Sequence, residues 1–155
     1  MQLSMLGEYS LRAMLFLANE KDGTIVRISD IADEWDIPEK FLRKIIPMLN
    51  NAGLIQTIRG KNGGVRLAKN AEMITPLHIL EAVEGEYVLH RCFIDNKLCQ
   101  RSSWCAMHIF WRETQQKFKE LLSSKTLLQL VEEIRESKRH LKQSARTISE
   151  MSVED

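Results

Sequence analysis

The fold is decided by the stretch from residue 38 to residue 67, which reads PEKFLRKIIPMLNNAGLIQTIRGKNGGVRL. Its first half predicts a helix, because Pro38 suits a first helical position and apolar residues then recur at helical intervals as far as Leu49. Gly53 is a stop signal for that helix. Pro47 lies inside the run, where we expect it to kink or shorten the helix.

The second half of the stretch predicts a two-stranded hairpin. Residues 54–59 are rich in β-formers and predict a strand, and residues 65–67 predict its return strand. Between them, residues 60–64 form a turn in which Asn62-Gly63 is a strong hairpin signal.

Two helices are expected before this stretch. The first covers about residues 4–19 and ends near Asp22-Gly23. The second is short, with Ser29 as its N-cap and an apolar face ending at Trp35, and a turn at residues 36–38 follows. Helix, turn, helix and hairpin in this order predict a winged helix-turn-helix, a mainly α fold with a small β wing.

The chain after the wing divides into three parts. Thr75-Pro76 caps a helix that closes at Gly85, so we place the DNA-binding domain at residues 1–84. Residues 85–102 are irregular and form a loop, and residues 103–136 contain a long helix and a closing helix that starts after a capping box at Thr126. Residues 137–155 are polar, and we expect a frayed or disordered tail.

Composition limits the function classes. The chain has 155 residues, 44% of them apolar and 28% charged, which is ordinary for a globular protein. Glu8 interrupts the start of the chain, which argues against a secretory signal, and no run approaches the roughly 18 apolar residues of a membrane span. We therefore expect a cytoplasmic protein with reduced cysteines.

Charge is distributed unevenly along this chain, although its formal net charge is only +1. Residues 38–70 contain seven bases and one acid, for a net +6, whereas residues 20–37 contain six acids and two bases, for a net −4. A basic helix and wing indicate phosphate binding, and the bland alternative is a solvated charged face. The candidate DNA-binding residues are Lys40, Arg43, Lys44, Arg59, Lys61 and Arg66.

Their positions suggest different roles. Arg43 is a candidate for reading guanine in the major groove, whereas Lys40 and Lys44 are better placed for phosphates. Arg59 and Lys61 belong to the predicted wing tip, which could reach a minor groove.

A second constellation follows the pattern Cys92-x6-Cys99-x5-Cys105-x2-His108. Thiolates are soft ligands for zinc or iron–sulfur clusters, and a spacing of three places Cys105 and His108 on one helical face. An iron–sulfur cluster is the favoured interpretation. The alternatives are a zinc site, free structural cysteines and a Cys105–His108 nucleophile; the last lacks any visible oxyanion donor, so no enzyme activity is expected.

Three motifs together resemble the IscR/NsrR family of transcription regulators. They are Met1-Gln2-Leu3 with Gly7-Glu8-Tyr9-Ser10-Leu11-Arg12-Ala13, the wing Arg59-Gly60-Lys61-Asn62-Gly63-Gly64-Val65-Arg66-Leu67, and the three-cysteine loop with His108. The resemblance covers about residues 1–135. It implies a winged helix-turn-helix homodimer, paired through the long helix from Ser103 to Leu122, that binds a DNA operator and senses through an iron–sulfur cluster.

The resemblance leaves the cluster type open between two branches. Cys105-x2-His108 resembles the iron–sulfur-biogenesis regulators, which implies a 2Fe–2S cluster held by Cys92, Cys99, Cys105 and His108. Glu8 is the alternative fourth ligand, because the nitric-oxide-sensing branch uses a carboxylate at the matching position to complete a 4Fe–4S cluster. We expect 2Fe–2S, with a nitric-oxide- or iron-sensing 4Fe–4S regulator and a zinc-stabilised DNA-binding protein as alternatives.

Overall fold

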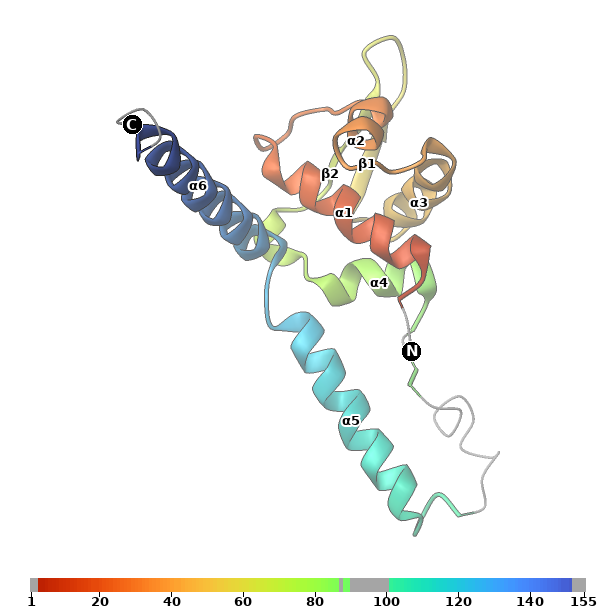
Figure 1. Ribbon diagram of the computed structural model, residues 1–155. Coiled ribbons are helices and arrows are strands. Elements are labelled where there is room, and N and C mark those ends of the chain that lie inside the picture. Colours follow the sequence, from red (N-terminus) through yellow and green to blue (C-terminus); the bar gives the residue numbers. More distant parts are fainter. Residues whose placement is uncertain (1–2, 87, 90–100, 152–155) are drawn as a thin grey trace.

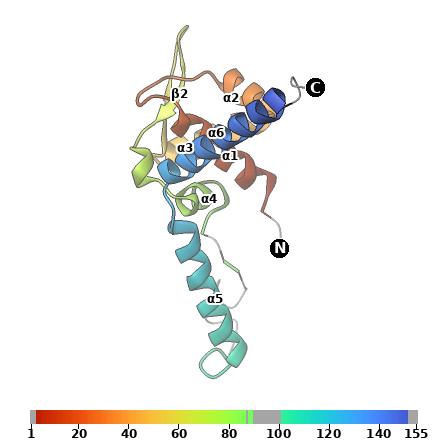
Figure 2. The same cartoon turned by 60° about the vertical axis from the view of Figure 1, so that its left-hand side comes forward.

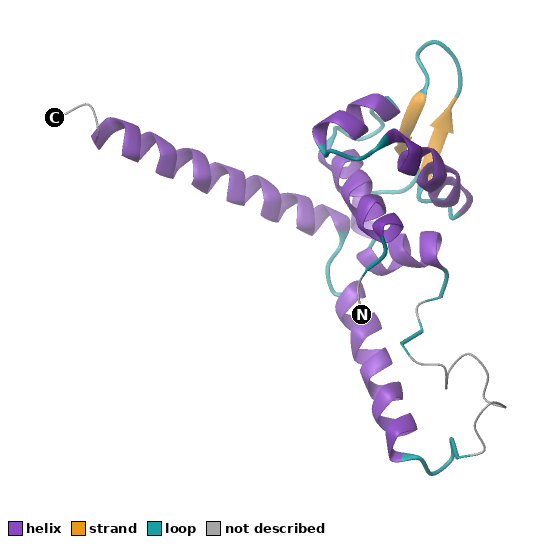
Figure 3. Cartoon of the chain, turned by 45° about the vertical axis from the view of Figure 1, so that its right-hand side comes forward, coloured by secondary structure: helices purple, strands orange, loops and turns teal. Residues whose placement is uncertain are grey.

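The computed structural model describes residues 3–86, 88–89 and 101–151, and it is mainly helical with a two-stranded wing (Figures 1 and 3). The predicted winged helix-turn-helix is confirmed. In chain order its elements are α1 (Met5–Asn19), α2 (Ile28–Glu34), α3 (Glu39–Asn51), β1 (Ile55–Ile58), β2 (Gly64–Leu67), a 3-10 turn (Ala71–Met73), α4 (Pro76–Glu84), α5 (Ala106–Ser123) and α6 (Leu127–Met151).

The core lies where α1 packs against α3, α4 and the start of α6. Met14 of α1, Leu42 and Ile45 of α3 and Ile79 of α4 are fully buried there. Tyr9 of α1 meets Phe41 of α3 edge-on, with ring centroids 5.0 Å apart. Burying one such apolar side chain contributes about 1.5–3 kcal/mol, so this packing fixes how α3 is presented.

The turn between α2 and α3 depends on Asp36, which adopts a positive φ of 49°. Asp tolerates this left-handed conformation better than most residues. It lets Ile37 turn back into the core, where it is 2% exposed and its N–H donates to Ala32 O at 2.9 Å. Pro38 is the N-cap of α3 rather than its first helical residue, so the helix begins at Glu39, one residue later than predicted.

Pro47 does not shorten α3, because the helix includes it and continues to Asn51. The side chain is exposed, on the face of α3 opposite the core. A proline there leaves the carbonyl of Arg43 without its helical donor, a smaller cost beside water than in the core.

The N-cap prediction for α2 was wrong. The N-cap is Arg27, with an extended backbone, and the hydroxyl of Ser29 donates instead to Asp30 Oδ1 at 3.3 Å. The reason is the preceding residue: Val26 pairs with Val65 of the wing through two backbone bonds of 2.9 and 2.8 Å. Because Val26 is held in an extended conformation, the helix begins directly after its neighbour.

The wing is an antiparallel pair in which Ile55 faces Leu67 and Ile58 faces Gly64. The positive φ in its loop belongs to Gly60, at 110°, and not to the Asn62-Gly63 pair that signalled the hairpin. Gly63 and Gly64 are instead needed for space. A Cβ on Gly64 would lie 2.2 Å from Val26 O, and one on Gly63 would lie 2.4 Å from Ile58 O.

The caps predicted after the wing are confirmed. Thr75 and His78 form a capping box before α4, with Pro76 in its first turn and Gly85 at its end. Thr126 and Gln129 bond to each other in the same reciprocal way before α6, at 2.8 and 3.3 Å.

The last two helices leave the domain in different directions (Figure 2). α5 starts at Ala106, later than predicted, and none of its residues is buried. α6 is anchored by buried Leu127 and Val131, and Arg135 donates to Oδ1 and O of Asn19 at 2.9 and 3.0 Å. Where a frayed or disordered tail was expected after residue 137, the structure continues α6 as far as Met151. In the described part of the chain, no helix has the length and apolarity to cross a membrane.

The close approach of Val26 to the wing generates a prediction about stability. Gly64→Ala should reduce the free energy of unfolding by about 1–3 kcal/mol, because backbone atoms must move to admit the methyl group. Chemical denaturation measures this, with Asn62→Ala at an exposed wing-loop position as the control. Equal stability of Gly64→Ala and the wild type would contradict the close approach.

Candidate nucleic-acid interface and cluster ligands

The exposed face of α3 carries three bases. Lys40, Arg43 and Lys44 are exposed, whereas Leu42 and Ile45 between and beside them are fully buried. The helix therefore cannot hide these charges without exposing its apolar face. They are available to a major groove, into which an α-helix fits.

In the free protein the bases of α3 have only weak partners. Arg43 donates to Glu39 across 2.8 Å, and the Nζ of Lys40 lies 5.5 Å from the ring centroid of Phe41. The Arg43 and Glu39 side chains are both largely exposed, and such surface ion pairs contribute little stability. A phosphate or a guanine edge can compete for Arg43 at small cost.

The wing is attached to the end of α3 by a side chain. Asn50 Oδ1 accepts a hydrogen bond of 3.1 Å from the backbone N–H of Thr57 in β1. This bond fixes the wing relative to the helix, so the two present their bases together. Arg59 and Lys61 are exposed in the loop between the strands, as predicted.

Arg66 differs from the other predicted DNA-binding residues. It is half-buried in β2, and its guanidinium donates twice to Gln56 Oε1 on the facing strand, at 3.1 and 2.8 Å. It therefore stiffens the wing, and a role in DNA binding would require it to share this partner.

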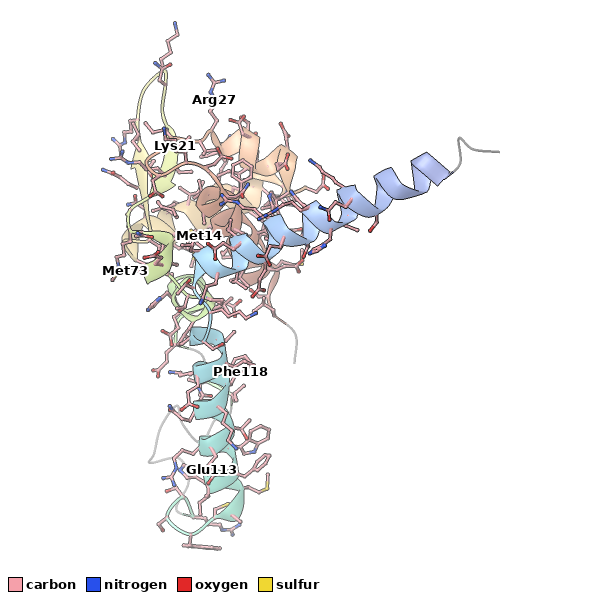
Figure 4. All side chains as sticks on the ribbon, turned by 90° about the vertical axis from the view of Figure 1, so that its left-hand side faces the viewer. Met14, Lys21, Arg27, Met73, Glu113 and Phe118 are labelled. Atoms are coloured by element: carbon pink, nitrogen blue, oxygen red, sulfur yellow. The ribbon has the colours of Figure 1, made fainter. Side chains whose placement is uncertain are left out.

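One exposed base escaped the sequence reasoning. Figure 4 shows Arg27 extending from the N-terminal end of α2 toward the same end of the molecule as the wing. It was missed because its segment, residues 20–37, is acidic overall. Its position between the Val26 bridge and α2 is visible only in the fold.

The cysteine constellation is described only in part. Cys105 is the N-cap of α5, half-buried and without a side-chain capping bond, and His108 N donates to Cys105 O at 3.0 Å. The predicted pair is thus brought together on the first turn of one helix. Cys92 and Cys99 lie outside the described residues. Among the described ones, no three His, Cys, Asp or Glu side chains form a group that could hold a metal ion.

Glu8 lies in a different place, on the first part of α1, where it forms an ion pair with Arg12. That end of α1 rests on the end of α4: Ser4 Oγ donates to Glu84 Oε1 at 2.8 Å. The first turn of α5 lies at the opposite end of that helix from α4 (Figures 1 and 2). The arrangement of one chain therefore does not join Glu8 to Cys105.

Lys119 links α5 to the region where the cysteine loop departs. Its amine lies 3.5 Å from Glu81 of α4 and 3.0 Å from Glu86 just beyond it. The hydrogen bond to Glu86 raises the pKa of Lys119 above its usual value, with both carboxylates adding attraction. Leu89 N also donates to Gln115 Oε1 of α5 at 2.8 Å. The start of the loop is thereby held along α5.

α5 exposes an apolar surface near its two ends. Met107 is 56% exposed, Phe110 54% and Leu121 70%. Phe118, labelled in Figure 4, is half-buried. Met107, Phe110 and Leu121 lie on one face of α5, and exposed apolar residues on one helix face indicate an interaction surface.

Comparisons with known proteins agree on one family. Residues 3–133 match the family Rrf2, described as "Iron-dependent Transcriptional regulator". The chain is 33% identical over 132 residues to "HTH-type transcriptional regulator NsrR" of Bacillus licheniformis, covering 84% of this chain and 92% of the relative. It is 34% identical over 132 residues to the NsrR of Bacillus subtilis, covering 84% and 90%.

Solved structures agree with this. The global cysteine regulator CymR of B. subtilis superposes with a TM-score of 0.71 at 28% identity, covering 85% of this chain and 97% of that one. The T. potens IscR superposes with a TM-score of 0.72 at 25% identity, covering 88% and 90%.

The basic surface generates a prediction about DNA affinity. Arg59→Ala and Lys61→Ala should each weaken binding to a DNA duplex and reduce the slope of log affinity against log salt by about 0.9 for each phosphate that is no longer neutralised. Arg43→Ala should also alter sequence preference, measured by selection from a random duplex library. Arg112→Ala, at an exposed base on the face of α5 opposite Leu121, is the control and should change neither. Salt-independent affinity, unaffected by all three substitutions, would contradict this interface.

Proposed function

This chain belongs to the Rrf2 family of transcriptional regulators, and from that premise we propose that it is a cytoplasmic homodimer whose DNA affinity is controlled by an iron–sulfur cluster. The observation that carries the proposal is the joint presentation of α3 and the wing, with Lys40, Arg43, Arg59 and Lys61 exposed on one domain. The homologues are transcriptional regulators, and the protein is not an enzyme.

The described ligand candidates fit a cluster chemically. A thiolate at the N-terminus of α5 is favoured by the helix dipole, and no acidic residue competes for the first turn. His108 adds a nitrogen donor one turn along, and both residues are only half-buried. Cys105 and His108 would hold the cluster together with Cys92 and Cys99. When bound, the cluster supplies one-electron redox chemistry and a centre that oxidants can attack.

We favour a 2Fe–2S cluster with His108 as the fourth ligand. His108 is close to Cys105 along the helix, since its backbone N–H donates to Cys105 O and both residues belong to the first turn of α5. A histidine ligand raises the reduction potential relative to four thiolates and makes it sensitive to pH where imidazole titrates.

A second candidate is a 4Fe–4S cluster with Glu8 as ligand in a nitric-oxide- or iron-sensing regulator. The similarity to two NsrR regulators favours it. It requires Glu8 to leave Arg12 and to approach Cys105, which in this arrangement means that a second subunit supplies the carboxylate.

A homodimer would bury the apolar residues of α5. Pairing two copies through this helix places two winged domains on opposite sides of a two-fold axis, which suits an operator of approximate two-fold symmetry. Because Lys119 and Gln115 hold the start of the cysteine loop along α5, a change in that loop would alter how α5 sits on α4. The spacing of the two domains would then follow the state of the cluster.

The ligand assignment is tested by spectroscopy under anaerobic conditions. His108→Ala should shift the visible spectrum or speed cluster loss, Glu8→Ala should do little, and Cys105→Ala should lose the cluster. DNA affinity is then compared for the holo and apo proteins. Cluster loss in Glu8→Ala with an unchanged spectrum in His108→Ala would transfer the proposal to the 4Fe–4S candidate. A colourless protein containing zinc would refute both.

The dimer is tested by substituting an exposed residue of α5. Phe110→Asp or Leu121→Asp should yield monomers in sedimentation, because an aspartate in the interface would have to shed its hydration. Weaker operator binding should accompany dissociation. Arg112→Asp, at an exposed position on the opposite face of the same helix, changes charge without removing an apolar side chain and serves as the control. A wild-type monomer at micromolar concentration would contradict the assignment.

A further inference from the structure

Two segments of this chain together carry a net charge of +10, although the whole chain is nearly neutral. The whole chain carries +1, the segment 38–70 carries +6, and the segment 138–146 carries four bases without an acid, which leaves −9 for everything else. The first segment is the proposed DNA interface. The second belongs to α6, and its residues 138–144 are exposed outside the core.

The second segment extends beyond the part of the chain shared with the family. The family match ends at residue 133, whereas α6 continues to Met151. We call residues 134–151 the arm. Its base is fixed, because Leu127 and Val131 are buried and Arg135 is bonded to Asn19. The residues from 138 to 144 are exposed.

Three bases of the arm lie at spacings that bring them together. Lys138 and Lys142 are four residues apart, and Arg139 is three residues before Lys142. Like charges at such spacings destabilise an isolated helix by a few tenths of a kcal/mol per pair. The Arg139 guanidinium donates to the carbonyl of Arg135 at 3.4 Å, and among the described residues none of the three bases forms an ion pair. An external anion would remove this repulsion.

α6 projects from the side of the domain away from α3 and points toward the level of α2, whereas the start of α5 lies at the opposite end of the molecule (Figures 1 and 3). The arm therefore extends outward from the domain that presents Arg59 and Lys61. Its apolar residues are too sparse for a lipid surface: between 135 and 144 the only large one in the sequence is Leu141.

We propose that the arm is a second DNA contact, in which Lys138, Arg139 and Lys142 bind phosphates of the duplex beside the site held by α3 and the wing. The inference rests on the proposed DNA-binding function. The arm would add affinity without reading sequence, because phosphate contacts carry no direct sequence information. Its effect in each subunit is independent of the cluster.

The test uses the full chain and a fluorescent DNA duplex of mixed sequence that extends past both winged domains. The triple substitution Lys138→Gln, Arg139→Gln and Lys142→Gln keeps good helix formers and removes three charges. It should weaken binding at least tenfold at low salt and reduce the slope of log affinity against log salt by about 0.9 for each phosphate that the arm no longer neutralises. The charge-preserving exchange Lys138→Arg, Arg139→Lys and Lys142→Arg should leave both at their wild-type values.

The outcomes separate the arm from the rest of the interface. One outcome is that the wild type binds the duplex and Arg59→Ala weakens that binding, while the glutamine variant keeps the wild-type affinity and salt slope. This result would overturn the arm proposal and leave the proposed function intact. If the wild type binds no duplex at all, the proposed function itself fails. Binding of phosphatidylserine vesicles that depends on the arm, with an unchanged DNA slope, would overturn the proposal in favour of a lipid surface. Circular dichroism verifies that the variants keep their helix.

Discussion

The packing of α3 on α1 is the interaction on which the rest of the structure depends. Leu42, Ile45 and Leu49 have one apolar face to bury, and α1 offers Tyr9 and Met14 to receive it. Once that face is buried, the intervening Lys40, Arg43 and Lys44 are forced outward. The same packing fixes the end of α3, so that Asn50 can hold β1 and the wing stands beside the helix. The proposed DNA-binding surface is thus a consequence of which residues the core excludes.

Features set by residues close together in the sequence were predicted correctly, whereas features set by contacts between distant residues were not. Thr75, Gly85 and Thr126 act within their own helices, so neighbouring residues were enough to predict their caps. Ser29 was misread because the start of α2 is set by Val26, which is bound to Val65 far along the chain. Gly63 and Gly64 were read as turn formers, whereas they are needed because backbone oxygens of Ile58 and Val26 come close. Contacts between distant residues are invisible to a pattern of neighbours.

The cysteine site divides in the same way. The spacing of Cys105 and His108 is a local property, and the helix realises it on one turn. The choice between His108 and Glu8 is not local, because Glu8 belongs to α1. The start of α1 is held against the end of α4 by Ser4 and Gly7. A Cβ on Gly7 would lie 2.2 Å from Glu84 Oε1, so α1 and α4 approach closely where the cysteine loop begins. Sequence alone offers both ligands, and the choice between them depends on how the proposed dimer brings α1 and α5 together.

The charge distribution connects these features to DNA recognition. A net charge of +1 suggests a nearly neutral protein. The segments 38–70 and 138–146 nevertheless carry +6 and +4, and the other residues together carry −9. At physiological salt the Debye length is about 8 Å, so a duplex responds to the nearest surface rather than to the total. The acidic remainder, including residues 20–37, repels the duplex in other orientations. Repulsion would therefore restrict the approach to orientations in which the basic surfaces meet the phosphates. The proposed base-reading side chains of α3 would then act on a complex that is already aligned.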